Sequence, residues 1–252
     1  AVIAGGITQV NIFVGTIIAS SADSAIAYLY YADRLYQLPL GIIGIAIGTV
    51  LLPELSRHIG AGREAEARTS QSQSLFLSMV LSMPAAGALI ALALPVVRVL
   101  FERGAFGPGD SVNVSQALIA FAVGIPAFVL IRVLQPGFFS RKDTKTPTWF
   151  AAISLVINIA LSLLLFGTWK HVGIAFATSV AAWVNVILLA VFLARRGHFR
   201  LEPREWRQQA MIALLTAVMA GALYGAVVLL GPVFDPGYFF PLQALALAAL
   251  CV

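Results

Sequence analysis

The residues best suited to chemistry in this chain are an aspartate and an arginine that lie side by side in an apolar segment. Arg34 lies about nine residues into segment 25–52, a depth of roughly 14 Å along an α-helix. That is near the middle of a hydrocarbon core about 30 Å thick, where an unpaired arginine costs at least ~2.5–3.5 kcal/mol. Because a guanidinium matches phosphate oxygens with paired hydrogen bonds, we predict that Arg34 binds an anionic headgroup. Arg132, near the end of its own apolar segment, is expected to snorkel to the headgroups.

Other polar residues share a helical face with Arg34. They are Tyr30, Asp33, Gln37 and Gly41. Spacings of three and four residues place them on one side of a helix. Two interpretations remain open: the face lines a substrate cavity that Asp33 and Gln37 also contact, or Asp33 and Arg34 form a pair that only holds helices together. Segment 1–20 has a similar polar stripe that contains Asn11, and we expect this residue to face the same cavity.

Segment 25–52 also contains a predicted hinge. As a straight helix it would be about 42 Å long, so it must tilt, bend or protrude. Pro39 removes one helical hydrogen bond, and its ring clashes with the preceding turn. We expect a kink at Pro39 and Gly41, beside the polar face, because broken helices accompany the substrate sites of many transporters.

Two further polar residues, Asn158 and Thr178, lie in later apolar segments. Such residues usually form interhelical hydrogen bonds worth ~1 kcal/mol, and an ion site is the less favoured alternative. No other metal site is expected, because the three histidines are scattered in or beside loops. The sequence has no GxSxG, P-loop or HExxH motif and no paired carboxylates within an apolar segment. Neither an enzyme nor a bound cofactor is therefore predicted.

The composition indicates a membrane protein. Of the 252 residues, 60% are hydrophobic and 11% are charged, and the mean hydropathy is +0.93. Soluble domains are roughly 45–50% apolar and about 25% charged, so a soluble enzyme, a nucleic-acid-binding domain and a disordered tail are disfavoured. The single cysteine, Cys251, excludes an intrachain disulfide. The net charge of +5 fits loops that face anionic lipid better than it fits nucleic acid.

Eight apolar segments predict the fold. They are 1–20, 25–52, 74–94, 112–134, 149–166, 172–194, 211–230 and 238–252. A span in lipid must satisfy its own backbone, and these segments lack the alternation of membrane strands. We therefore predict an all-α polytopic membrane protein with about eight transmembrane helices. The connector 54–69 is expected to form a surface helix pair or a plain loop, and 95–110 to contain a short helix on the membrane surface.

The basic residues indicate the orientation. Eleven of the sixteen lie in the connectors after the second, fourth and sixth segments. By the positive-inside rule these connectors are cytoplasmic. The chain opens inside an apolar segment, and its last segment is shorter than the roughly 20 residues that a spanning helix needs. We therefore expect a piece of a larger membrane protein.

Five blocks of sequence, in the same order, resemble the MurJ (MviN) family of lipid II flippases. This family belongs to the multidrug/oligosaccharidyl-lipid/polysaccharide exporter superfamily. The blocks are YADRL at 31–35, PLGIIGIAIGTVLLPELS at 39–56, LFERGAF at 100–106, LQPGFFSRKDTKTP at 134–147 and KHVG at 170–173. They extend over residues 31–173, and the weaker ends fit by hydropathy.

The resemblance implies a fold of fourteen helices in two six-helix lobes with an additional terminal pair. This chain would hold the second lobe (1–205) and the terminal helix pair (206–252), with the last helix incomplete. In the family, arginines of a central cavity contact the substrate diphosphate, and Asp33 and Arg34 match that position. Gln37 stands where some members have an acidic residue.

The resemblance also bears on ions and lipid. Some members bind sodium within this lobe, where Asn158 and Thr178 match expected ligands but Ser162 replaces a carboxylate. The resemblance further implies that the last two helices border a groove suited to a polyprenyl tail.

The implied function is transport of lipid II from the cytoplasmic to the periplasmic face of the bacterial inner membrane by alternating access. The implied partners are lipid II, membrane lipid and the missing N-terminal lobe, with no nucleic acid. Two alternatives remain open: a related exporter of other polyprenyl-linked sugars or drugs, and a non-transporting membrane scaffold that binds such lipids.

Overall fold

The computed structural model describes residue 9 and residues 13–22, 24–199 and 203–229. The helices are 13–19, α2 (Ala25–Gly60), α3 (Glu64–Ala91), α4 (Ala93–Phe101), α5 (Pro108–Ala122), α6 (Ile125–Phe139), α7 (Lys145–Arg195) and α8 (Pro203–Leu229). This part of the chain contains no strand, so the predicted all-α fold is confirmed. Within it, five stretches are long and apolar enough to cross a membrane: α2, α3, α5 together with α6, α7, and α8.

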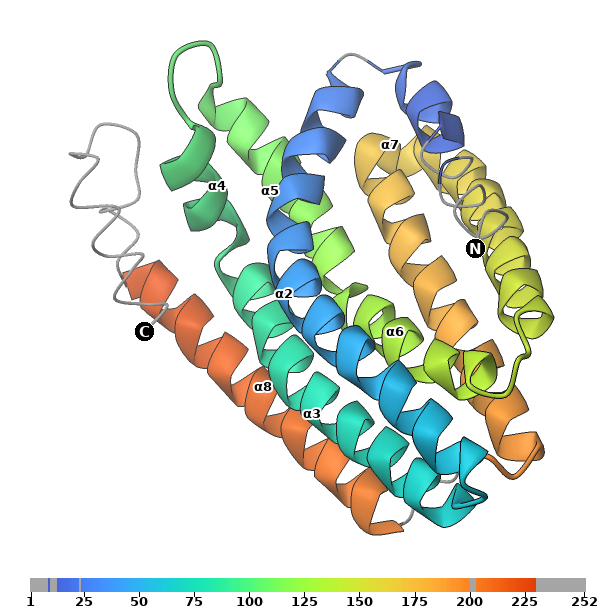
Figure 1. Ribbon diagram of the computed structural model, residues 1–252. Helices are drawn as coiled ribbons and strands as arrows, with labels where there is room; N and C mark the ends of the chain where they lie inside the picture. Colours follow the sequence, from blue (N-terminus) through green and yellow to red (C-terminus); the bar gives the residue numbers. More distant parts are fainter. Residues whose placement is uncertain (1–8, 10–12, 23, 200–202, 230–252) are drawn as a thin grey trace.

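The helices pack as a bundle around α2 (Figure 1). α2 packs against α3, α5 and α6; α3 also packs against α6 and α8, and α7 packs against α5 and α6. The core lies where these helices meet, and four of its large side chains are less than 2% exposed. They are Leu51, Leu118, Leu134 and Phe138. This packing buries one side of α2 and leaves the other side open.

α7 is a hairpin of two arms. As a straight helix its 51 residues would measure about 77 Å, well beyond a hydrocarbon core of about 30 Å. The backbone reverses at Lys170, which has φ 48° and ψ −128°, and Figure 1 shows the two arms running antiparallel. The arms correspond to the predicted segments 149–166 and 172–194. They meet closely at Gly173, where an added Cβ would lie 2.9 Å from the Leu165 carbonyl oxygen.

The remaining predicted segments agree with the helices to differing extents. Segments 25–52, 112–134 and 211–230 coincide with α2, with α5 and α6 together, and with α8, and segment 74–94 overlaps α3. Most of segment 1–20 and all of segment 238–252 lie outside the described residues. The count of about eight spanning helices therefore stays a prediction.

The two connectors that were expected to have structure differ in outcome. In 54–69 there is neither a separate helix pair nor a plain loop, because α2 and α3 extend beyond the predicted apolar segments and meet at a tight turn. Gly62 closes that turn with φ 72°, and Ser70 Oγ donates to Glu54 Oε1 at 2.7 Å across the two helices. In 95–110 the predicted short helix is present as the end of α4, and its position on the membrane surface stays a prediction.

The basic connectors lie together at one end of the bundle, which we call the basic end. It comprises 61–63, 140–144 and 196–199 with the adjoining helix ends, at the lower right of Figure 1. Arg141 Nη2 donates to Glu64 Oε2 at 2.5 Å, and Arg196 Nη1 donates to Asp143 Oδ2 at 2.7 Å. Burial opposes ionisation of Asp143, but hydrogen bonds from Thr146 and Arg196 hold its pKa below the usual value. Two charged pairs therefore join the three connectors.

Candidate functional site

The polar face predicted on α2 is present and open. Arg34 Nη2 donates to Tyr30 Oη at 2.9 Å, one turn earlier in the helix. The Arg34 Cζ atom lies 4.7 Å from the centroid of the Tyr30 ring, within the range of a cation–π contact. Both side chains remain exposed. Because a guanidinium has five N–H donors, the contact with Tyr30 positions Arg34 and still leaves donors for a ligand.

Asp33 is paired with Gln37. The Gln37 Nε2 atom donates to Asp33 Oδ2, one turn apart. Within the described residues no ion pair joins Asp33 to Arg34. The reason is geometric, since consecutive residues of an α-helix point about 100° apart. The interpretation of Arg34 as half of a structural ion pair therefore finds no support in this geometry.

The opposite side of α2 is packed into the bundle. Its buried residues, all at most 8% exposed, include Ala32, Leu35, Leu40 and Ile43. The Tyr36 ring stacks on Phe121 with ring centroids 4.8 Å apart. The polar face is thus turned away from the core of this lobe. On that outward side of a membrane helix, a charge needs a polar cavity or another protein surface. Asn11, which was expected to face the same cavity, lies outside the described residues.

A second arginine, carried by α6, reaches the polar side of α2. A Cβ placed on Gly44 would lie 2.6 Å from Arg132 Cδ and 2.9 Å from its Nε, so the Arg132 side chain lies over this glycine. Gly44 follows Gln37 by two helical turns but is buried, so it lies where the polar face borders the packed side of α2. Two guanidinium groups are therefore spread along roughly 15 Å of one helix, an arrangement suited to a ligand with several acidic groups.

The predicted hinge lies within an unbroken helix. α2 is α-helical from Ala25 to Gly60, with Pro39 and Pro53 inside it. Figure 1 shows α2 changing direction between its darker first half and its paler second half. A Cβ on Gly41 would meet nothing within 4 Å, so close packing does not require glycine there. Movement about Pro39 and Gly41 stays a prediction.

Asn158 and Thr178 meet between the two arms of α7. Thr178 Oγ1 and Ser162 Oγ both donate to Asn158 Oδ1, each at 3.4 Å. Asn158 and Ser162 are buried, at 6% and 2% exposed. The geometry is that of the expected interhelical hydrogen bond. The described residues contain no group of three or more His, Cys, Asp or Glu side chains placed to hold a metal ion, and a sodium site here stays a prediction.

Comparison with known proteins identifies the family. A family profile described as lipid II flippase MurJ matches residues 1–245. A probable lipid II flippase MurJ of Rhizobium tropici is 48% identical over 223 residues, covering 88% of this chain and 42% of that protein. A lipid II flippase MurJ of Burkholderia cenocepacia is 30% identical over 226 residues, covering 89% of this chain and 44% of that protein. The chain thus spans less than half the length of these relatives.

Solved structures share the architecture. The structure described as lipid II flippase MurJ in an inward closed conformation has a TM-score of 0.77 and 27% identity, covering 97% of this chain and 49% of that one. An outward-facing multidrug resistance MATE family transporter of the MOP superfamily has a TM-score of 0.65 at 18% identity, which shows a shared fold. This chain is a polytopic membrane protein that belongs to the lipid II flippase MurJ family.

Proposed function

We propose that this chain supplies the second lobe of a lipid II flippase of the bacterial inner membrane. In this proposal the whole protein moves the lipid-linked peptidoglycan precursor from the cytoplasmic to the periplasmic face. The observation that carries the proposal is the exposed Arg34 guanidinium, on a face of α2 turned away from the core of its own lobe. It has no acidic partner within the described residues, so its donors are available to an anionic substrate.

The proposed mechanism needs no covalent step. Arg34 binds the diphosphate of the lipid, because its planar fork of donors matches phosphate oxygens. Arg132, held over Gly44, offers a second cation farther along α2. The missing first lobe closes the other side of the cavity, and the two lobes rock about this site by alternating access. Pro39 and Gly41 allow α2 to bend as the cavity changes shape.

In this proposal the six-helix lobe comprises residues 1–205 and the terminal helix pair comprises residues 206–252. The boundary lies in the first turn of α8, which is the first helix of the pair. α8 packs chiefly against α3, and none of its described residues is buried. A helix attached through one neighbour fits a peripheral position beside the lobe, where it can border the lipid tail.

The test replaces Arg34 in the full-length protein. Arg34→Ala should abolish flipping, and Arg34→Lys should restore it only in part, because an ammonium is a point donor. Arg63→Ala is the matched control, since Arg63 is an exposed arginine that pairs with Glu66 at 2.9 Å at the basic end. Lipid II exposure at the outer face is measured together with the amount of protein in the same cells.

A second variant separates binding from support of the fold. If Arg34 only stabilised the helix against Asp33, the double change Asp33→Ala and Arg34→Ala would restore function. Flipping at the wild-type rate by this double variant would overturn the proposed site.

The orientation has its own test. With Cys251 replaced by Ser, a cysteine at exposed Ala105 should react with an impermeant thiol reagent in spheroplasts, and a cysteine at exposed Thr144 should not. The expectation follows because Thr144 belongs to the basic end and Ala105 to the opposite end. Equal labelling at the two positions would contradict a cytoplasmic basic end.

A further inference from the structure

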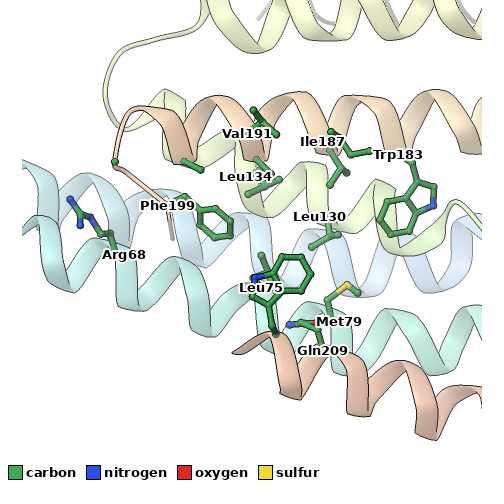
Figure 2. A pocket seen from close by; sticks show the side chains of 15 residues that line it. Arg68, Leu75, Met79, Leu130, Leu134, Trp183, Ile187, Val191, Phe199 and Gln209 are labelled. Atoms are coloured by element: carbon green, nitrogen blue, oxygen red, sulfur yellow. The ribbon is translucent and has the colours of Figure 1, made fainter. Parts of the chain in front are cut away.

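A cavity of about 900 Å³ lies between α3, α6, the second arm of α7 and the start of α8 (Figure 2). Its wall is mostly apolar, with side chains such as Leu75, Met79, Leu130, Leu134 and Ile187. The lining given by the described residues includes none from α2. The cavity is therefore separate from the polar face, and its volume lies within the roughly 300–1,000 Å³ of ligand sites.

The cavity has the depth of one membrane leaflet. Along the second arm of α7 its lining runs from Trp183 to Ala194, roughly 17 Å of helix. Half of a hydrocarbon core of about 30 Å is about 15 Å. The cavity starts at the basic end, where Arg68 and Gly197 line it. It can thus hold one acyl chain of a lipid from the leaflet at the basic end.

The mouth of the cavity carries an arginine, Arg68, that has no ion-pair partner among the described residues. Arg68 is exposed and forms no ion pair or hydrogen bond within the described residues. The three nearby carboxylates already have partners, because Glu64 pairs with Arg141, Asp143 pairs with Arg196, and Glu205 accepts a hydrogen bond from Ser72. Arg68 is therefore free to bind a phosphate.

The pKa of His198, at the basic end, also depends on these nearby charges. Its pKa is lowered, first by burial and then by the charge of Arg141, with Arg196 and Arg68 acting in the same direction. Glu64 opposes them. Three arginines and one carboxylate thus act on His198, a balance that favours an anionic headgroup near this site.

Farther along the wall there is a polar atom with no partner. The Gln209 Oε1 atom is buried and has no hydrogen bond within the described residues. Figure 2 shows the Gln209 side chain beside Met79 at the wall. Trp206, one turn earlier and 63% exposed, has the character of an interfacial aromatic. A pure hydrocarbon chain leaves this oxygen unsatisfied, whereas the polar linker of a lipid brings hydroxyl groups or bound water.

We propose that the cavity holds a resident anionic glycerophospholipid from the leaflet at the basic end. Its phosphate binds Arg68, its glycerol region lies beside Gln209, and one acyl chain lies along the second arm of α7. The lipid fastens α8 to the lobe, because α8 and α7 contribute opposite walls of the cavity. It is a structural component and differs from the transported lipid, which the polar face of α2 binds.

Native mass spectrometry of the purified full-length protein tests this site. The protein is delipidated in detergent and mixed with phosphatidylglycerol or with phosphatidylcholine of the same acyl chains. Phosphatidylglycerol should be retained preferentially, and Arg68→Ala should weaken its apparent affinity roughly fivefold, as for the loss of one basic residue near a headgroup. Arg63→Ala is the control and should leave the affinity unchanged, because Arg63 is paired with Glu66 and does not line the cavity.

A second variant fills the cavity without altering charge. Ala190 lines the wall, so Ala190→Phe should reduce the retention of both lipids. Equal retention of the two lipids by the wild type, or equal affinities in Arg68→Ala and Arg63→Ala, would overturn the proposal. Recovery of a polyprenyl diphosphate lipid from the cavity would also overturn it and assign the space to the transported tail. If Ala190→Phe does not accumulate, the comparison of the two arginine variants decides.

Discussion

Two sets of polar side chains lie in the membrane-spanning helices, and their surroundings differ. The α2 cluster consists of Tyr30, Asp33, Arg34 and Gln37. The α7 cluster consists of Asn158, Ser162 and Thr178. The α2 cluster contains charged groups and is largely exposed on its lobe, whereas the α7 cluster is neutral and lies between the two arms of one hairpin.

The comparison distinguishes polar side chains that stabilise the fold from polar side chains that are available to bind a partner. In the α7 cluster one amide oxygen accepts two hydroxyl donors, so the hairpin satisfies its own polar atoms. In the α2 cluster the guanidinium of Arg34 uses one donor on Tyr30 and has no carboxylate partner within the described residues. Since burying such a group in lipid is costly, its remaining donors must be met from outside this lobe.

The largest effect is expected from reversing the charge of the α2 cluster. In the full-length protein, Arg34→Glu should lower flipping more than ~100-fold, because placing like charges together costs several kcal/mol. Protein levels should stay normal, since the side chain is exposed on its lobe. Lipid II exposure per molecule of protein is the measurement, and activity within tenfold of wild type would remove the distinction between the two clusters.

A smaller effect is expected from separating the arms that hold the α7 cluster together. Gly173→Ala places a Cβ 2.9 Å from the Leu165 backbone, and overpacking of this kind costs about 1–3 kcal/mol. Gly167→Ala is the matched control, because a Cβ there meets nothing within 4 Å. Thermal unfolding in detergent compares the two variants. Equal midpoints would show that the arms tolerate a wider separation.

Removing the acceptor of the α7 cluster should cost less. Asn158→Leu leaves two hydroxyl groups without their shared oxygen, a loss of about 1 kcal/mol for an interhelical hydrogen bond. We expect a lower unfolding midpoint with flipping that stays within about twofold of wild type. Loss of transport with normal stability, or a change in its dependence on sodium, would instead make the α7 cluster functional.

The smallest effect is expected at Tyr30. Tyr30→Phe removes the 2.9 Å hydrogen bond to Arg34 but keeps the ring beneath the guanidinium. A single exposed hydrogen bond contributes about 0.5 kcal/mol, so flipping should fall by about twofold. Tyr30→Ala also removes the ring and should be worse. Equal activities of the two variants would show that the ring does not position Arg34.

The features that sequence analysis predicted correctly are those that depend on local periodicity. The polar face around Arg34 follows from spacings of three and four residues, which an α-helix translates directly into one side. The all-α fold follows from apolar segments that must satisfy their own backbone. The gathering of the basic connectors at one end follows from helices that alternate in direction across the membrane.

The features that were not predicted have two origins: the choice of side-chain partner within one helix, and the choice of neighbouring helices. From the sequence, Asp33 could pair with Arg34 or with Gln37. It accepts a hydrogen bond from Gln37, because the angle between consecutive residues of a helix separates Asp33 from Arg34. The contact of Arg132 with Gly44 exists only because α6 packs beside α2. α2 and α3 also extend past their apolar segments and contact each other through Ser70 and Glu54, a pairing that composition alone does not predict.

The ion pairs at the basic end couple the helices mechanically. Arg141 with Glu64 and Arg196 with Asp143 cross-link the ends of α3, α6 and both arms of α7, so a displacement of one helix end pulls on the others. In the proposed transport cycle these helices should therefore rotate as one block. α3 and α6 each contain one internal proline, whereas α2 contains two and takes part in neither ion pair, so most of the bending is expected in α2. Because salt screens partly exposed pairs, high ionic strength should soften the block before it alters the polar face of α2.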